Sequence, residues 1–113
     1  MIEFTSDTLS AQIEVHPATV MDILEKDAIL GKIDYDNIPE KERTLTIVHY
    51  PNMIVCSEGF ITFGDKNVDV KELTLEQMKQ TGILFSVWRD KVMELNPELF
   101  GITRAVPDTK KKK

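Results

Sequence analysis

Cysteine, positive charge and long apolar runs are all scarce in this chain, and each shortage argues against a class of protein. The chain has one cysteine, Cys56, in 113 residues, so no internal disulfide can form and an extracellular disulfide scaffold is disfavoured. Its 14 basic residues against 19 acidic ones give a net charge of -5, which would repel a nucleic-acid backbone. No stretch approaches the roughly 20 apolar residues of a membrane span, and Met1 to Phe4 do not begin a signal peptide. These shortages predict a soluble cytoplasmic protein that binds neither nucleic acid nor a membrane.

The rest of the composition fits an ordinary globular protein. The chain is 42% hydrophobic and 29% charged, which lies outside the composition of disordered proteins. A domain of this length buries enough surface to fold without a metal or a disulfide. We expect one domain over residues 1–103, with a β element at 1–15 and a mainly helical part at 17–100. The basic segment 104–113 is expected to be a disordered tail.

Residues 1 to 15 alternate between apolar and polar side chains, which is the period of a half-buried strand. Ser6 and Asp7 interrupt the alternation with turn residues. The apolar positions are Ile2, Phe4, Leu9, Ala11, Ile13 and Val15. This pattern predicts a β-hairpin or two short strands.

A helix is predicted from Ala18 to Leu30, because Pro17 suits a first helical turn and Gly31 suits a C-terminal stop. Most of its apolar side chains cover one broad face, namely those of Val20, Met21, Ile23, Leu24, Ala28 and Leu30. Asp27 is the exception, since it projects from the middle of this apolar arc. Either the helix frays or bends there, or Asp27 is an acid that is paired across an interface.

The middle of the chain gives conflicting signals. Glu40 to Arg43 favour a helix, whereas Leu45 to Tyr50 and Met53 to Cys56 have the composition of strands. Pro51 would break either element, because it lacks a backbone N–H. We expect one helix that ends near Tyr50 and a second that begins at Pro51, with a strand pair as the alternative. Phe60 to Phe63 is either a short strand or an apolar plug over the core.

The last third of the chain holds the clearest helix signals. Thr74 and Gln77 have the spacing of a capping box, in which each side chain bonds the backbone N–H of the other residue. The final helix is predicted from Leu84 to Leu95, because Asn96 can adopt a left-handed cap and Pro97 prevents continuation. Its apolar arc consists of Leu84, Phe85, Trp88, Val92 and Leu95. The expected fold class is therefore α+β, mainly α with a small N-terminal β-hairpin, in one compact domain.

No group of residues has the spacing that catalysis or metal binding requires. His16 and His49 have no cysteine, histidine or carboxylate at a recognised metal spacing. Cys56 follows His49 by seven residues, but a lone cysteine usually packs as a small apolar side chain. The glycines are scattered singly, so no phosphate-binding loop is predicted. We therefore expect a protein that is not an enzyme and has no catalytic residue, no cofactor and no metal.

Several segments, taken in their order, resemble the tail assembly chaperones of tailed bacteriophages. They are Ile13-Glu14-Val15, Pro17 to Leu24, Tyr50-Pro51, Leu73 to Gln77 and Val87-Trp88 to Pro97. The resemblance implies a small, largely helical, non-catalytic protein of the host cytoplasm that shields the apolar tape measure protein until tail tube subunits replace it. It also implies absence from the mature virion and makes the major tail tube protein a further partner to expect. The β-rich composition of the middle of the chain departs from that family.

Several chaperones of this family are also made in an extended form by programmed ribosomal frameshifting. The run from Lys110 to Lys113 implies A-rich codons, which can form a slippery site. The alternative is that these lysines are an added or solubilising tail. The nucleotide sequence of the gene distinguishes the two.

Four residues are the candidates to contact the partner. Ile83, Val87 and Met93 lie outside the apolar arc of the final helix, and Asp27 interrupts the arc of the first. We expect them to pack against apolar helices of the client. The other functions left open are a head-tail connector or tail terminator of the virion, and a small acidic inhibitor of a basic host surface. The sequence does not determine the oligomeric state.

Overall fold

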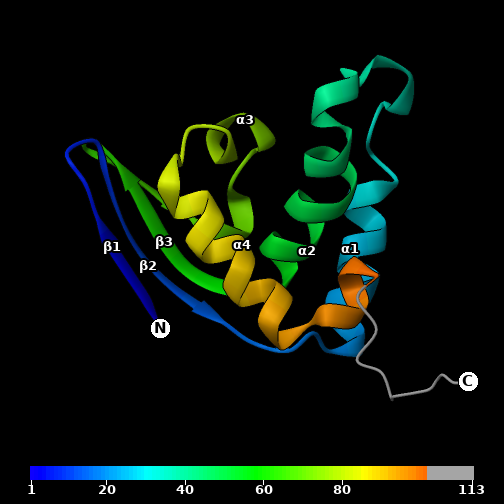
Figure 1. The fold of residues 1–113 in the computed structure, drawn as a ribbon, viewed down its shortest axis with the longest axis horizontal. Coiled ribbons are helices and arrows are strands. Elements are labelled where there is room, and N and C mark those ends of the chain that lie inside the picture. The colour runs from blue at the N-terminus through cyan, green and yellow to red at the C-terminus, as the bar shows by residue number, and fades with distance from the viewer. Residues whose placement is uncertain (102–113) are drawn as a thin grey trace, which may run out of the picture.

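The computed structural model describes residues 1–101, in which four strands form one antiparallel sheet with the longer helices on one side of it (Figure 1). The strands are β1 (Ile2–Thr5), β2 (Leu9–Val15), β3 (Ser57–Phe63) and β4 (Lys66–Asp69), and they lie side by side in the order β1-β2-β3-β4. In the central pair, Ile13 of β2 lies opposite Gly59 of β3. The predicted tail at 104–113, with its terminal lysines, lies outside the described residues.

This sheet corrects the predicted fold class. Strands make up 22% of residues 1–101 and helices 53%, so the expectation of a mainly α protein with a small hairpin is wrong. The predicted hairpin exists as β1 and β2. A lone hairpin is marginally stable, and here β3 and β4 extend the sheet from the second edge of β2. Their inward side chains Ile61 and Val68 enlarge its buried face.

Two residues conceal β3 in the sequence. Its inward positions begin with Ser57 and Gly59, so the apolar alternation of this strand is confined to Ile61 and Phe63. Gly59 is needed because its φ is 128° and an added Cβ would lie 2.0 Å from the backbone oxygen of Gln12. The segment from Phe60 to Phe63 is therefore strand and not an apolar plug.

The α-helices are α1 (Val20–Leu30), α2 (Tyr50–Val55), α3 (Leu75–Met78) and α4 (Ile83–Leu95). Short 3-10 turns occupy Tyr35–Asn37, Glu40–Glu42, Val70–Glu72 and Pro97–Phe100, and a π-helical turn occupies Leu45–His49. Within residues 1–101, no helix is both long and apolar enough to cross a membrane.

The helical interpretation of residues 45–55 is confirmed, and the alternative strand pair does not form. Pro51 fits because it occupies the first turn of α2, where its missing N–H breaks no α-helical bond. The turn before it is wound more widely, so that the Tyr50 N–H donates to the Leu45 carbonyl, five residues back. The helix thus runs past the proline without the break that the sequence suggested.

The two predicted caps have different outcomes. The capping box is confirmed: Thr74 Oγ1 accepts from the Gln77 N–H at 3.1 Å, and Gln77 Oε1 accepts from the Thr74 N–H at 2.9 Å. The left-handed cap at Asn96 is wrong, because its φ is -139°. Instead, the buried Asn96 Oδ1 accepts from the Ala18 N–H at 2.7 Å, and Nδ2 donates to the His16 carbonyl at 3.1 Å. Asn96 thereby ties the end of α4 to the segment that leads into α1.

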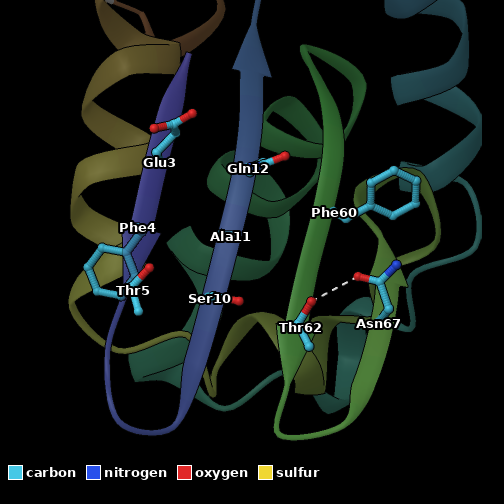
Figure 2. Close-up of a pocket in the computed structure, with 9 residues that line it drawn as sticks. All are labelled: Glu3, Phe4, Thr5, Ser10, Ala11, Gln12, Phe60, Thr62 and Asn67. Atoms are coloured by element: carbon cyan, nitrogen blue, oxygen red, sulfur yellow. Dashed lines mark hydrogen bonds between the residues drawn. The ribbon is translucent and has the colours of Figure 1, made fainter.

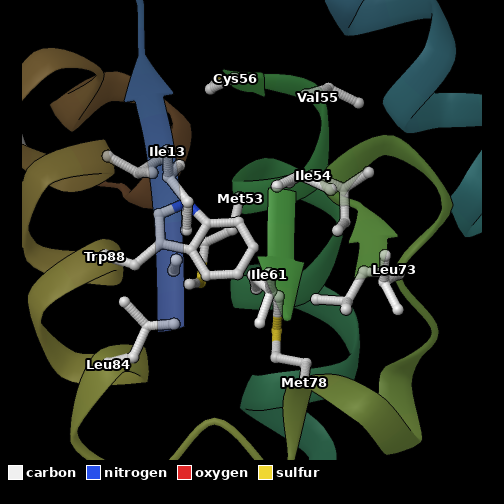
Figure 3. Packing of buried hydrophobic residues seen from close by; sticks show 14 of the residues in the cluster. Ile13, Met53, Ile54, Val55, Cys56, Ile61, Leu73, Met78, Leu84 and Trp88 are labelled. Carbon is white, nitrogen blue, oxygen red and sulfur yellow. The ribbon is translucent and has the colours of Figure 1, made fainter. Parts of the chain in front are cut away.

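The core lies between the inner face of the sheet and the helices α2 and α4 (Figure 3). Trp88 is fully buried there, and its Nε1–H donates to Ser57 Oγ at 2.8 Å. Leu84 and Val92 are buried on the same side of α4, as their spacing predicted. Other large side chains of this core are Ile13, Met53, Ile61, Leu73 and Met78.

Candidate partner-binding surface

Helix α1 turns most of its apolar side chains away from the rest of the protein. None of its residues is buried, although it packs against α2 on the side remote from the sheet (Figure 1). The exposed fraction is 73% for Val20, 71% for Met21, 55% for Leu24 and 40% for Ile23. A surface helix normally turns such an arc to the core. We define the α1 outer face as Val20, Met21, Ile23, Leu24, Asp27 and Ala28, all of which are exposed. Glu25 is also exposed and lies beside Met21, at the edge of this face.

Polar contacts at its N-terminus set the rotation of α1. The Thr19 Oγ1 accepts from the Asp22 N–H at 3.2 Å, and Asp22 Oδ2 accepts from the Thr19 N–H at 2.9 Å. This capping box starts the helix at Val20, two residues later than predicted. Because Asp22 also lies 3.7 Å from His16 Nδ1, it is held on the inner side of the helix, and the apolar arc is left on the outer side.

Asp27 lies in the middle of the α1 outer face. Helical spacing places it within one turn of both Ile23 and Leu24, and its side chain is exposed. Within residues 1–101, no cation lies within ion-pair distance of its carboxylate. The helix runs unbroken from Val20 to Leu30, so it does not fray at Asp27. Asp27 is therefore an exposed acid among exposed apolar side chains.

Ile83 and Val87 form a second apolar patch, on α4. They lie one turn apart and are 75% and 45% exposed. Val87 also lines a shallow hollow of about 390 Å³ between α4 and the first strand. Met93 is half-buried and lies roughly 120° around the helix from Val87, so it does not extend this patch. Asp27 does not extend it either, because α2 lies between α1 and α4 (Figure 1).

Sequence reasoning identified Asp27 but missed its neighbours. Val20, Met21 and Leu24 belong to an arc of the kind that usually packs in a core, so they were not candidates for a partner. Asp27 itself was the signal that this face of the helix is exposed, since a carboxylate is rarely buried in a core without a partner. The structure thus brings Ile83 and Val87 together on α4, and places Asp27 on a separate surface.

The outer face of the sheet is open and mostly polar (Figure 2). A shallow hollow of about 520 Å³ lies over β1, β2, β3 and β4, and Thr62 Oγ1 donates to Asn67 Oδ1 at 2.9 Å on its floor. Two aromatic residues, Phe4 and Phe60, are among its lining residues, and Phe60 is 50% exposed. An antiparallel sheet commonly leaves one such face to solvent, and the single carboxylate, Glu3, gives this hollow no cluster of reactive groups.

A more apolar hollow of about 440 Å³ lies beside the π-helical turn, with Leu45, His49, Met78 and Phe85 among its lining residues. The His49 ring stands edge-on to Phe85, with 6.0 Å between centroids. Burial lowers the pKa of His49, and the charge of Arg89 lowers it further. The ring is therefore neutral near pH 7 and acts as a packing group.

Cys56 and His49 do not form a nucleophile and base. They are seven residues apart on one continuous helical segment, which separates them by roughly 10 Å along its axis. Cys56 is buried, and burial raises the pKa of its thiol to about 11, so the reactive thiolate is scarce at neutral pH. Among the described residues, no group of histidine, cysteine and acidic side chains could hold a metal ion.

The α1 outer face is thus the most distinctive surface of residues 1–101, and Ile83 with Val87 is a smaller one. A comparison of the chain with protein-family models, with curated proteins and with solved structures finds no match.

Proposed function

We propose that this protein is a non-catalytic tail assembly chaperone that binds apolar helical segments of a tape measure protein. The observation that carries the proposal is the outward orientation of the α1 apolar arc. Exposed apolar surface of this kind marks an interaction site, and its spacing matches the packing of one helix on another. The α1 outer face would cover the client in the host cytoplasm until tail tube subunits replace it, so the chaperone would be absent from the mature virion.

The size of the surface suits reversible binding. Full burial of each Val, Leu or Met side chain contributes about 1.5 to 3 kcal/mol, and α1 offers four large apolar side chains that are already partly covered. Association costs offset much of this sum. The expected result is a complex that tail tube subunits can displace.

The patch of Ile83 and Val87 would supply a second contact to the same client. A long apolar client has room for both contacts, and two weak contacts on one molecule bind more tightly together than either does alone. The contact of Met93 with a partner stays a prediction. Its side chain is half-buried and lies away from both surfaces, so neither surface supports this contact.

Co-expression with the tape measure protein tests the proposal. The wild-type chain is expected to co-purify with the client and to raise its soluble fraction. The double variant Met21→Ser/Leu24→Ser should lose both effects, because it removes two apolar side chains of the α1 outer face. The control Phe60→Ser replaces a similarly exposed apolar side chain on the outer face of the sheet and should keep both effects.

Equal client solubility with and without the protein would contradict the proposal, and so would equal loss in the double variant and the control. Mass spectrometry of purified particles provides an independent check. The chaperone should be missing from them, whereas its presence in stoichiometric amount would indicate a connector or terminator of the virion.

A further inference from the structure

A partner that covers the α1 outer face must also cover Asp27. The carboxylate lies within one helical turn of Ile23 and Leu24, and Leu24 is 55% exposed. Removing a carboxylate from water without a compensating charge or hydrogen bond is strongly unfavourable. The chemistry of the partner is therefore constrained at this position.

The protein itself supplies no cation to Asp27 within residues 1–101. Lys26 is half-buried toward the inner side of α1, and neither it nor Lys32 forms an ion pair with Asp27. The last turn of α1 has no basic residue, although the C-terminal end of a helix dipole favours a positive charge. Both features favour a cation that comes from the partner.

A second copy of the chain is a poor partner for the same reason. The α1 outer face contains one acid and no lysine or arginine. A symmetric dimer would place this surface against itself and would cover two Asp27 carboxylates without a cation. A wholly apolar helix would likewise leave Asp27 uncompensated.

We propose that the segment bound by the α1 outer face is an amphipathic helix that carries a lysine or arginine within its apolar side, paired with Asp27. This inference rests on the proposed docking function of α1 and adds the selection of the client. The apolar side chains provide the contact area, and Asp27 selects helices with a basic residue in register.

Three synthetic peptides test the selection. They share one amphipathic helical sequence and differ at a single position in the middle of the apolar side, which is Lys, Gln or Glu. Fluorescence anisotropy with the full-length protein should show the Lys peptide binding about fivefold more tightly than the Gln peptide, with the Glu peptide weakest. The preference should shrink as salt is added.

Variants of the protein separate charge from shape. Asp27→Asn should bind the Lys and Gln peptides equally, and Asp27→Lys should reverse the order so that the Glu peptide binds best. Glu25→Gln removes the same charge from the same helix but outside the outer face as defined above, so it should keep the wild-type preference. A wild-type protein without preference, or an Asp27→Asn protein that retains it, would overturn the inference.

The variant Leu24→Ser distinguishes the failure of this inference from that of the docking function. If it weakens all three peptides while the wild type binds them equally, the surface docks helices and the role of Asp27 is rejected. If no peptide binds, or if Leu24→Ser changes nothing, both proposals fail. Sedimentation equilibrium should show a monomer, and a dimer that Leu24→Ser dissociates would identify a second copy as the occupant instead.

Discussion

At the scale of single residues, Asn96 connects two segments that lie far apart in the sequence. Its side chain accepts from the N–H of Ala18, 78 residues away in the sequence, and donates to the carbonyl of His16. These bonds satisfy backbone groups at the junction of β2 and α1, which no neighbouring element pairs in a ladder. One amide side chain thus helps to position the helix that presents the candidate surface.

Substitutions of Asn96 distinguish these long-range hydrogen bonds from a role as a helix cap. Both Asn96→Ala and Asn96→Gly should lower the free energy of unfolding by about 2 to 3 kcal/mol, because each leaves buried polar groups unpaired. If Asn96 were a left-handed cap, Asn96→Gly would be tolerated. Urea unfolding provides the measurement. Asn67→Ala, on the exposed face of the sheet, is the control and should change stability by about 0.5 kcal/mol or less.

Cys56 should make stability depend on alkaline pH. Burial raises the pKa of its thiol from 9.0 to about 11, so between these values the folded protein holds a proton that the unfolded chain has lost. The stabilisation is fully present below pH 9 and declines as pH rises toward 11, by up to about 2 kcal/mol. Unfolding free energies across this range should fall more steeply for the wild type than for Cys56→Ala. Parallel pH profiles would contradict the assignment.

At the scale of elements, the pairing of β2 with β3 is the feature that local sequence patterns do not predict. The two strands are paired along Leu9–Val15 and Ser57–Phe63, but two α-helices, two 3-10 turns and a π-helical turn separate them in the chain. Their close approach depends on Gly59, since no larger residue fits beside the Gln12 carbonyl. Gly59 is therefore a strand residue, although glycine is generally depleted in strands.

Gly59→Ala should test this close approach. The substitution places a methyl group against the backbone of β2 at an unfavourable φ, and we expect a loss of about 3 kcal/mol or more in the free energy of unfolding. Gly64→Ala is the matched control, because Gly64 also has a positive φ of 65° but has open space around it. That variant should lose about 1 to 2 kcal/mol. Similar losses in both variants would show that backbone conformation alone sets the requirement.

The elements that the sequence predicted well depend on interactions within a few residues. The capping box at Thr74 and the buried stripe of Leu84, Trp88 and Val92 are examples. The left-handed cap predicted at Asn96 failed, and the pairing of β3 with β2 was not predicted, because both features depend on partners far along the chain. The sequence predicted that Asp27 belongs to the candidate surface. It did not predict that the apolar neighbours of Asp27 point outward.

At the scale of the whole molecule, the sheet, α2 and α4 bury one another, while α1 lies at the edge and packs on α2 (Figure 1). The core is complete without the outer residues of α1: the largest buried side chains come from other elements. The apolar arc of α1 is thus available for binding at little expense to folding.

The double variant Met21→Ser/Leu24→Ser should therefore leave stability nearly unchanged. We expect a shift of about 1 kcal/mol or less in the free energy of unfolding, because both side chains are exposed. It should also elute earlier from a hydrophobic-interaction column than the wild type. Met53→Ser, in the fully buried core, should lose about 3 kcal/mol or more. A comparable loss in the double variant would show that α1 turns its arc inward in solution.

The sequence by itself determined the N-terminal hairpin, the helix start at Thr74 and the buried stripe of α4, because each follows from a period or a cap that acts locally. Only the tertiary structure decided the pairing of β2 with β3 and the rotation of α1. Hydrophobic burial is non-directional, so an apolar arc has the same pattern whether it covers a core or a partner. In this protein, the hydrogen bonds of Asp22 and Asn96 near the start of α1 hold its apolar arc on the outer side, away from the core.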